Sequence, residues 1–130
     1  MGHKAHKRWA PKSLRVGILT VSTTRSLAED KSGHWMNRHA QREGHPVVLH
    51  EVIADDQFEI AKKVADITIN QTADLLIING GTGLSPSDVT IEAVKPMFRK
   101  ELTALSPVFT QLSFESIDSA AMVSRASAGI

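Results

Sequence analysis

An apolar run that leads directly into three closely spaced glycines constrains the fold more than any other feature of this chain. Residues 75–78 read Leu-Leu-Ile-Ile without polar alternation, which is typical of a buried strand inside a parallel sheet. Residues 79–83 then read Asn-Gly-Gly-Thr-Gly. Because glycine tolerates positive φ and lets backbone approach a ligand closely, successive N–H groups of this loop can converge on an anion. The alternative is a plain tight turn.

Capping residues follow the glycines. Ser85, Ser87, Asp88 and Thr90 all suit the start of a helix that we expect over residues 91–95. A helix N-terminus would add partial positive charge beside the loop. The spacing matches neither the dinucleotide fingerprint Gly-x-Gly-x-x-Gly nor the P-loop ending Gly-Lys-Ser/Thr. The sequence therefore favours a phosphate site outside those two classes.

Strand-like and helix-like segments alternate through the rest of the chain. Residues 14–22 and 46–53 are apolar and β-branched enough to be strands. Residues 31–43, which stop before Gly44, and residues 57–71 have helical character. This alternation predicts an α/β fold with crossover helices and a mainly parallel central sheet. A length of 130 residues, 42% of them hydrophobic, suits a single domain.

Charge is distributed unevenly along the chain. Five of the fifteen Lys and Arg residues, and none of the fourteen acids, precede Val16; ten basic residues remain against fourteen acids, a net −4 for the body. This balance argues against nucleic-acid binding by the body. Residues 1–13 are predicted to form a flexible basic arm. The alternative is that Lys7, Arg8 and Trp9 dock on a partner subunit or an acidic ligand.

Composition also limits the cellular context. The chain has no cysteine, which excludes disulfides and thiolate metal sites. We find no apolar run of transmembrane length and no signal-peptide core in the sequence. These features predict a cytoplasmic protein that does not interact with membranes.

Three loops are expected at one edge of the predicted sheet. Ligands of open parallel sheets bind outside the carboxyl ends of the strands. That rule brings together residues 22–33, 54–56 and 79–90, which supply hydroxyls, amides and carboxylates. Carboxylates beside a phosphate favour a hard cation such as Mg²⁺ between them, because like charges otherwise repel. The sequence therefore predicts a metal-assisted reaction of a phosphate compound.

Several motifs, in the same order, closely resemble the MoaB/Mog family of molybdenum cofactor biosynthesis, and the MoaB branch most. They are Ile-Leu-Thr-Val-Ser at 18–22, Asp-Lys-Ser-Gly at 30–33, Gly-Gly-Thr-Gly at 80–83 with Ser-Pro-Ser-Asp-Val-Thr-Ile-Glu-Ala at 85–93, and Leu-Ser-Phe-Glu-Ser-Ile-x-x-Ala-Ala-Met-Val-Ser-Arg-Ala-x-Ala-Gly at 112–129. The resemblance covers residues 14–130. It implies a molybdopterin-binding domain with a three-layer αβα fold.

The resemblance further implies molybdopterin adenylyltransferase activity, in which Mg²⁺ and ATP adenylylate molybdopterin and pyrophosphate is released. By this match, Asp55 and Asp88 are the catalytic and metal-holding pair. Asp88 would hold Mg²⁺ against the triphosphate, and Asp55 would hold a second metal or orient the pterin phosphate. Two alternatives remain open: Asp88 is a helix N-cap, and Asp56 takes the place of Asp55.

The other binding residues implied by the resemblance surround the same pocket. They are Asn79, Gly80, Gly81, Thr82 and Gly83 as the phosphate cradle, Ser22, Asp30, Ser32 and Gly33 in the first loop, and Ser124 and Arg125 near the pterin. Arg125 is expected to pair with a phosphate, the alternative being a surface salt bridge. Asn79 replaces a family threonine, so we expect an altered contact and an intact site.

The resemblance also bears on assembly and length. It implies a homotrimer or homohexamer, with molybdopterin and ATP as substrates and the downstream molybdotransferase as a further partner. The alternative function is a non-catalytic molybdopterin-binding or assembly protein of the same pathway. Where this sequence reaches Ile130, the family continues into a strand, a Pro-Gly-Ser/Asn-Pro loop and a helix. We therefore expect a C-terminally incomplete domain whose parent reading frame continues.

Overall fold

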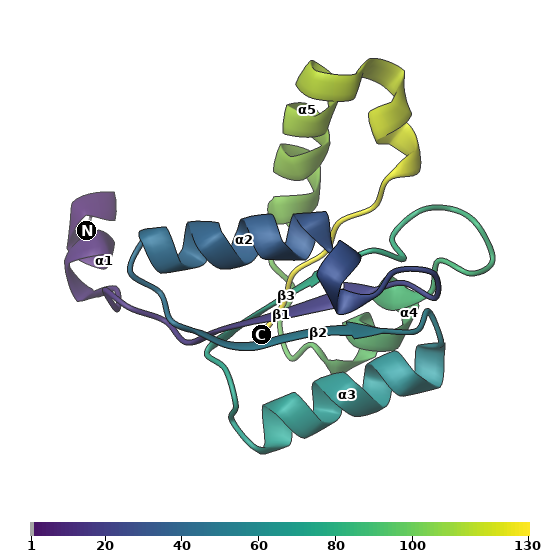
Figure 1. Cartoon of the computed structure of the whole chain (residues 1–130). Helices are drawn as coiled ribbons and strands as arrows, with labels where there is room; N and C mark the ends of the chain where they lie inside the picture. Colours follow the sequence, from purple (N-terminus) through teal and green to yellow (C-terminus); the bar gives the residue numbers. More distant parts are fainter. Residues whose placement is uncertain (1) are drawn as a thin grey trace.

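A three-stranded parallel sheet forms the centre of the computed structural model, which describes residues 2–130 (Figure 1). The strand order is β2-β1-β3, where β1 is Val16–Val21, β2 is Val47–Ile53 and β3 is Leu75–Asn79. Both neighbours run parallel to β1. All six residues of β1 are buried, because it has a strand on each edge and helices on each face. The predicted parallel α/β sheet is confirmed.

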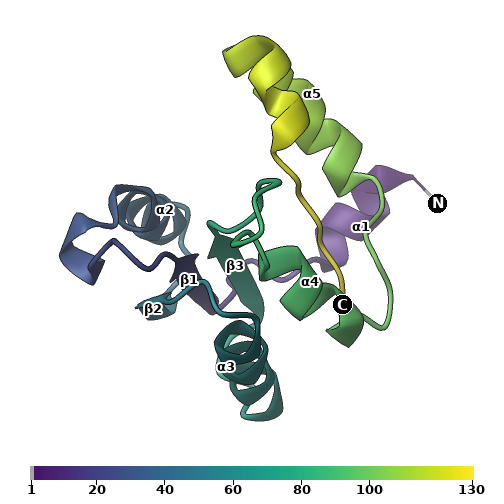
Figure 2. The ribbon, with the colours of Figure 1, turned by 90° about the vertical axis from the view of Figure 1, so that its right-hand side faces the viewer.

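Helices cover the two faces of the sheet, so that the fold has three layers (Figure 2). The helix α2, Lys31–Arg42, contacts β1 and β2 on one face. The helices α3, Gln57–Ile69, and α4, Thr90–Val94, pack against each other on the opposite face. The three helices predicted from the sequence are therefore confirmed, with ends that differ by one or two residues.

The core lies between the sheet and the α3–α4 layer. Leu19 and Val21 of β1 pack there with Ile60 and Val64 of α3 and with Ala93 of α4. Burial of each larger side chain stabilises the fold by about 1.5–3 kcal/mol. The strand β1 contributes to this core and leads directly into the loop of residues 22–33. The core therefore fixes the position of that loop at the carboxyl edge of the sheet, which we call the rim.

The third strand differs from the sequence-based expectation. We predicted that residues 75–78 lie inside the sheet, but β3 pairs with β1 alone and is an edge strand among residues 2–130. Leu75 at its start is 43% exposed, and the other four residues are half-buried. Leu76 and Ile78 of the run pack against the core, so an unbroken apolar run does not require a neighbouring strand on both edges.

The remaining helical segments lie around or beyond the sheet. They are α1 (His3–Trp9), η1 (Leu27–Glu29), η2 (Lys95–Met97), α5 (Leu105–Ile117) and η3 (Asp118–Val123). The helix α1 falls within the predicted arm of residues 1–13, whose flexibility stays a prediction; Met1 lies outside the described residues. No helix within residues 2–130 combines the length and apolar character needed to cross a bilayer.

The segment formed by α5 and η3, residues 105–123, projects away from the layers, and we call it the apolar arm (Figures 1 and 2). The two elements pack on each other and neither packs closely on another helix or strand of the described chain. No residue of α5 is buried. The exposed apolar side chains of the arm are Leu105, Val108, Phe109, Leu112, Phe114, Ile117, Met122 and Val123.

Candidate phosphate-binding site

The glycine loop, residues 79–83, leaves the carboxyl end of β3 with its carbonyl groups held by protein donors. Thr90 holds the first two: its Oγ1 donates to the Gly80 carbonyl at 2.8 Å and its N–H donates to the Gly81 carbonyl at 3.1 Å. Arg125 holds the next two. Its N–H donates to the Thr82 carbonyl at 3.0 Å, and its Nε donates to the Gly83 carbonyl at 3.0 Å.

The N–H groups of the same loop are in the opposite situation. Those of Gly81, Thr82 and Gly83 donate to no acceptor within residues 2–130. Successive N–H groups without internal acceptors, in a loop whose carbonyls are fixed elsewhere, are the donor set that anion-binding concavities use. The loop also lies at the carboxyl edge of a parallel sheet, where ligands of such folds bind. The arrangement suits phosphate oxygens.

Two of the loop glycines are required by their surroundings. Gly80 and Gly81 have φ angles of 90° and 65°, in the region that side chains disfavour. A Cβ on Gly80 would collide with the carbonyl oxygen of Val21, and a Cβ on Gly81 would collide with Oγ1 of Thr90. The loop is therefore packed tightly onto the end of β1 and the start of α4, which gives its N–H groups a fixed position.

Arg125 clamps this loop from the C-terminal side of the chain. Besides its bonds to Thr82 and Gly83, its Nη2 donates to the Asp88 carbonyl at 3.1 Å, and its guanidinium forms an ion pair with Glu92 of α4. The hydrogen bond with Glu92 raises the pKa of Arg125 and, in return, lowers the pKa of Glu92. The salt-bridge alternative for Arg125 is confirmed. A contact between Arg125 and a phosphate stays a prediction.

Asp88 lies half-buried in the turn that follows the glycines. Its Oδ2 accepts a hydrogen bond from the Ser85 N–H at 3.0 Å. The N-cap alternative for Asp88 is wrong, because the N-cap of α4 is Val89, one residue later. The other carboxylate oxygen of Asp88 accepts no hydrogen bond within residues 2–130, so it is available to a cation.

The two acids after β2 have different surroundings. Asp56 is the N-cap of α3, and its Oδ1 accepts from the Glu59 N–H at 2.9 Å. Asp55 is half-buried, and its carboxylate makes no hydrogen bond or ion pair in the described part of the chain. Asp55 has two carboxylate oxygens without a hydrogen bond in the described residues and Asp56 has one, so the preference for Asp55 stays a prediction.

Asp55 and Asp88 flank the rim from the two outer strands. The strands β2 and β3 lie on either side of β1, so their ends are separated by about 10 Å. No group of three or more His, Cys, Asp and Glu residues within residues 2–130 has the geometry of a metal site. Because Mg²⁺ is commonly held by one or two protein carboxylates together with substrate phosphates, these residues fit Mg²⁺ only in company with a phosphate ligand.

The first-loop residues lie at different depths. Ser22 is half-buried, and its Oγ accepts from the N–H groups of Thr24 and Arg25 at 3.3 and 3.1 Å. Ser32 is exposed in the first turn of α2. Asp30 and Gly33 are buried, so the structure brings Ser22 and Ser32 to accessible positions and places the other two beneath the surface.

Asp30 is the N-cap of α2 and is fully buried. Its carboxylate accepts hydrogen bonds from Thr20, Gly33 and His50. Burial alone would raise the pKa of Asp30, but the hydrogen bonds from His50, Thr20 and Gly33 outweigh it, and the pKa lies below its ordinary value. Asp30 is therefore a charged group whose partners in the described chain are all protein atoms, and its predicted ligand contact stays a prediction.

Ser124 completes the predicted set. It is half-buried, its N–H donates to the Ala121 carbonyl at 3.3 Å, and it precedes the Arg125 clamp. Sequence reasoning missed the roles of Thr20, His50, Thr90 and Glu92 around the loop. Thr20 carried a signal, because it is a polar residue in an otherwise apolar central strand.

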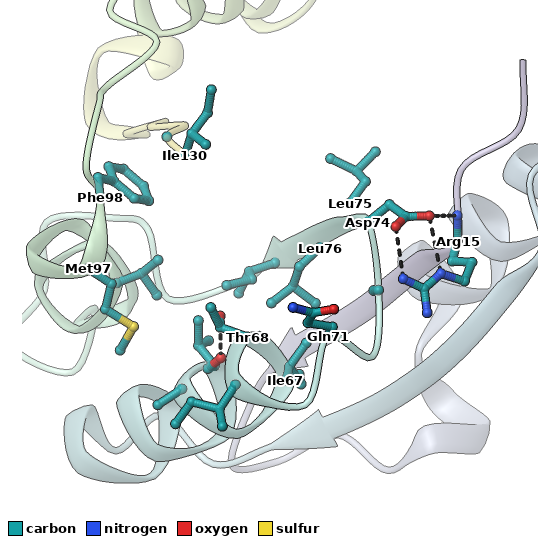
Figure 3. A pocket seen from close by; sticks show the side chains of 17 residues that line it. Arg15, Ile67, Thr68, Gln71, Asp74, Leu75, Leu76, Met97, Phe98 and Ile130 are labelled. Atoms are coloured by element: carbon teal, nitrogen blue, oxygen red, sulfur yellow. Dashed lines mark hydrogen bonds and ion pairs between the residues drawn. The ribbon is translucent and has the colours of Figure 1, made fainter. Parts of the chain in front are cut away.

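Two apolar hollows, of about 640 and 660 Å³, lie beside β3 and contain neither Asp55 nor Asp88. Figure 3 shows the first, in which Leu76, Ile67 and Phe98 line the cavity and the Arg15–Asp74 ion pair lies at its edge. It opens near the amino end of β3, away from the glycine loop. The second touches the loop at Asn79, Gly80 and Thr82 but is lined mainly by apolar side chains. Neither hollow offers the donors that the loop does.

Known families and sequences include clear relatives of this chain. The family described as "Probable molybdopterin binding domain" matches residues 17–130. Molybdenum cofactor biosynthesis protein B of Bacillus subtilis is 39% identical over 131 residues, covering 100% of this chain and 77% of that protein. A protein of Pyrococcus furiosus named molybdopterin adenylyltransferase is 36% identical over 132 residues, covering 100% of this chain and 76% of that protein.

Solved structures give the same result. A crystal structure of a molybdenum cofactor biosynthesis protein B superposes with a TM-score of 0.87 at 38% identity, covering 93% of this chain and 76% of that one. The tungsten cofactor synthesizing protein MoaB from Pyrococcus furiosus gives a TM-score of 0.82 at 35% identity, covering 93% of this chain and 75% of that one. The chain thus spans about three quarters of the length of these proteins.

Proposed function

Because this chain belongs to the MoaB/Mog family of molybdenum cofactor biosynthesis, we propose that it is a molybdopterin adenylyltransferase. In this reaction an oxygen of the molybdopterin phosphate attacks the α-phosphorus of ATP. The bond from that phosphorus to the β-bridging oxygen breaks, and pyrophosphate leaves with the bonding electrons. The Pyrococcus relative that carries this name supports the assignment.

The observation that carries the proposal is the donor set of the glycine loop. Transfer of a nucleotidyl group depends mainly on positioning and on neutralising charge that develops on phosphate oxygens. The N–H groups of Gly81, Thr82 and Gly83 have no acceptor among the described residues, and the clamps of Thr90 and Arg125 hold the loop in place before any ligand arrives. We propose that they bind phosphate oxygens of ATP.

The carboxylates take the metal-related roles. Asp88, one carboxylate oxygen of which accepts no hydrogen bond from the described chain, would hold Mg²⁺ against the triphosphate. Asp55, across the rim, would orient the pterin phosphate or hold a second ion. Bound Mg²⁺ would neutralise charge on the phosphates, as hard cations do in such sites.

Assembly is a second part of the proposal. An apolar arm with eight exposed apolar side chains and no buried residue in α5 supports a homo-oligomer, which we propose is trimer-based. The adenylylated pterin would pass to a molybdotransferase, the partner that the proposed reaction requires downstream.

Transfer of labelled AMP tests the activity. The protein is incubated with Mg²⁺, molybdopterin and ATP labelled at the α-phosphate, and adenylylated pterin is quantified. We expect transfer by the wild type and at least a hundredfold loss, on the order of one removed electrostatic contact in other enzymes, in Asp88→Asn. Asp56→Asn is the matched control; the asparagine side-chain oxygen can still accept from the Glu59 N–H as the cap of α3, and transfer should stay intact.

Binding without transfer would overturn the proposal. If the wild type binds molybdopterin and produces no adenylylated pterin with Mg²⁺ and ATP present, the chain acts as a non-catalytic molybdopterin-binding protein. If Asp56→Asn abolishes transfer and Asp88→Asn does not, the roles assigned to the acids are wrong.

A further inference from the structure

A chain of hydrogen-bonded side chains runs beneath the rim from β2 to the glycine loop. His50 of β2 lies 2.8 Å, Nε2 to Oδ2, from Asp30. The same Oδ2 accepts from Oγ1 of Thr20 in β1 at 2.7 Å. That hydroxyl oxygen in turn accepts from Nδ2 of Asn79, the last residue of β3, at 2.7 Å. This hydrogen-bond network therefore crosses all three strands and ends at Asn79, the residue before Gly80.

The charge of Asp30 sets the donor and the acceptor of each hydrogen bond in this network. A carboxylate only accepts hydrogen bonds, so the Thr20 hydroxyl must donate its single proton to Asp30. The hydroxyl can then only accept from Asn79, which fixes the NH₂ side of the Asn79 amide toward Thr20. At the other end, His50 must carry its proton on Nε2. Its Nδ1 lies 3.4 Å from the Asn37 amide nitrogen.

Burial makes this arrangement hard to replace. Asp30 is 0% exposed and Thr20 is 1% exposed, so water cannot substitute for a missing partner. Gly33 closes the site from α2: its N–H donates to Asp30, and a Cβ at this position would collide with Asp30 and His50. A buried polar group left without its partner costs more than an ordinary hydrogen bond contributes, so the four groups form a unit.

We propose that His50 and Asp30 are positioning residues that act through Thr20 to fix the Asn79 amide and, with it, the start of the glycine loop. In this role the two residues act from beneath the surface, since Asp30 is fully buried and the side chain of His50 is only 10% exposed. Their effect on nucleotide binding rests on the proposed function, whereas their effect on the conformation of the loop does not. The carbonyls of Gly80 and Gly81, which Thr90 holds, report that conformation.

Two substitutions at Thr20 form a matched test. Thr20→Val removes the hydroxyl and keeps the shape, whereas Thr20→Ser keeps the hydroxyl and removes a methyl group. NMR on the ¹⁵N-labelled full chain without ligand follows the Asn79 side-chain amide and exchange of the Thr90 N–H, which donates to Gly81. In Thr20→Val we expect Thr90 exchange to rise about tenfold and the Asn79 signals to shift, as loss of a buried hydrogen bond would produce. Thr20→Ser should resemble the wild type.

The outcomes separate positioning from general stability. Amides of α3, such as that of Val64, should exchange at wild-type rates in both variants, and the KM for ATP should rise in Thr20→Val alone. Equal Thr90 exchange in the two variants, or a rise shared by α3, overturns the proposal. If Thr20→Val does not fold, the pair His50→Phe and His50→Gln gives the same comparison at the other end of the hydrogen-bond network. His50→Phe removes the hydrogen bond to Asp30, and His50→Gln can keep it. If the wild type transfers no AMP, the proposed function fails, and the exchange data still show whether the network positions the loop.

Discussion

The glycine loop and the apolar arm are held in opposite ways. In the loop, the four carbonyls of residues 80–83 accept hydrogen bonds from Thr90 and Arg125, and the glycines fit tightly against β1 and α4. In the arm, α5 and η3 contact chiefly each other, and their apolar side chains are exposed. The loop is complete within one chain. The arm leaves a group of apolar side chains exposed, the kind of surface that a partner surface commonly covers.

The loop and the arm also suit different kinds of ligand. The loop offers polar backbone donors at fixed positions, which suits a small anion. The arm carries eight exposed apolar side chains and only two ionisable ones, Glu115 and Asp118, which suits contact with a protein surface. Damage to the loop should therefore affect nucleotide binding, and damage to the arm should affect assembly.

The largest expected effect is on the arm. Leu112→Glu places a charge on a residue that is 59% exposed in the single chain, and burying that charge between subunits would be unfavourable. We expect light scattering to show an assembly for the wild type and single chains of 14.2 kDa for the variant. Gln57→Glu, an identical change of charge at an exposed site of α3, should leave the assembly intact. A wild type that is already a single chain would contradict the oligomer.

The next effect is on the fit of the loop. Gly80 and Gly44 have nearly equal φ angles, 90° and 88°, but a Cβ on Gly44 would meet nothing within 4 Å. Gly44→Ala should therefore lower the free energy of unfolding by about 1 kcal/mol, the cost of the backbone conformation alone. Gly80→Ala adds a collision with Val21 and should cost about 3 kcal/mol. Urea unfolding measures both, and equal losses would show that the loop is not tightly packed.

A smaller effect is expected at the clamp. Arg125→Lys keeps the charge but cannot bond to Thr82, Gly83 and Glu92 together. We expect the Kd for Mg²⁺-ATP to rise about tenfold, and the amide signals of Thr82 and Gly83 to move before nucleotide is added. Arg99→Lys, at an exposed arginine without side-chain hydrogen bonds in the described residues, is the control. Unchanged loop signals in Arg125→Lys would refute the clamp.

The smallest effect concerns pH. The hydrogen bond from Arg125 holds the pKa of Glu92 below its ordinary value, so Glu92 stabilises the folded chain above its unfolded pKa, about 4.3. That contribution is lost as the pH falls through the lower folded pKa. The difference in urea midpoint between the wild type and Glu92→Gln should therefore be present at pH 6 and shrink below about pH 4. A difference that stays the same from pH 6 to about pH 3 would contradict the ion pair.

Local sequence patterns predicted most of the fold. The apolar runs gave three parallel strands, and the Ile60, Val64 and Ile67 spacing gave α3. The position of β3 at an edge was not predictable in this way, because an apolar run records what covers the faces of a strand and carries no information about its lateral neighbours. The arm was missed for a related reason: its apolar residues resemble a core segment, and exposure is a tertiary property.

The candidate site was predictable in its location and less so in its contacts. The glycines and Asp88 lie together as the sequence indicated, but Arg125 faces Glu92 and the loop carbonyls, and Asp30 is buried beside His50. Arg125 and Glu92 are separated by 33 positions in the sequence, and His50 and Asp30 by 20. Nothing in the local sequence pattern specifies such pairs. The family resemblance supplied the pterin and ATP, which no residue pattern could name.

The central claim is that the free N–H groups of the glycine loop bind the phosphates of ATP. Titration of the ¹⁵N-labelled protein with Mg²⁺-ATP, followed by NMR, tests it directly. We predict saturable shifts of the Gly81, Thr82 and Gly83 amides, with the arm amides, such as that of Leu112, unmoved. Saturable shifts at other amides, with those of Gly81, Thr82 and Gly83 unchanged, would contradict this binding mode.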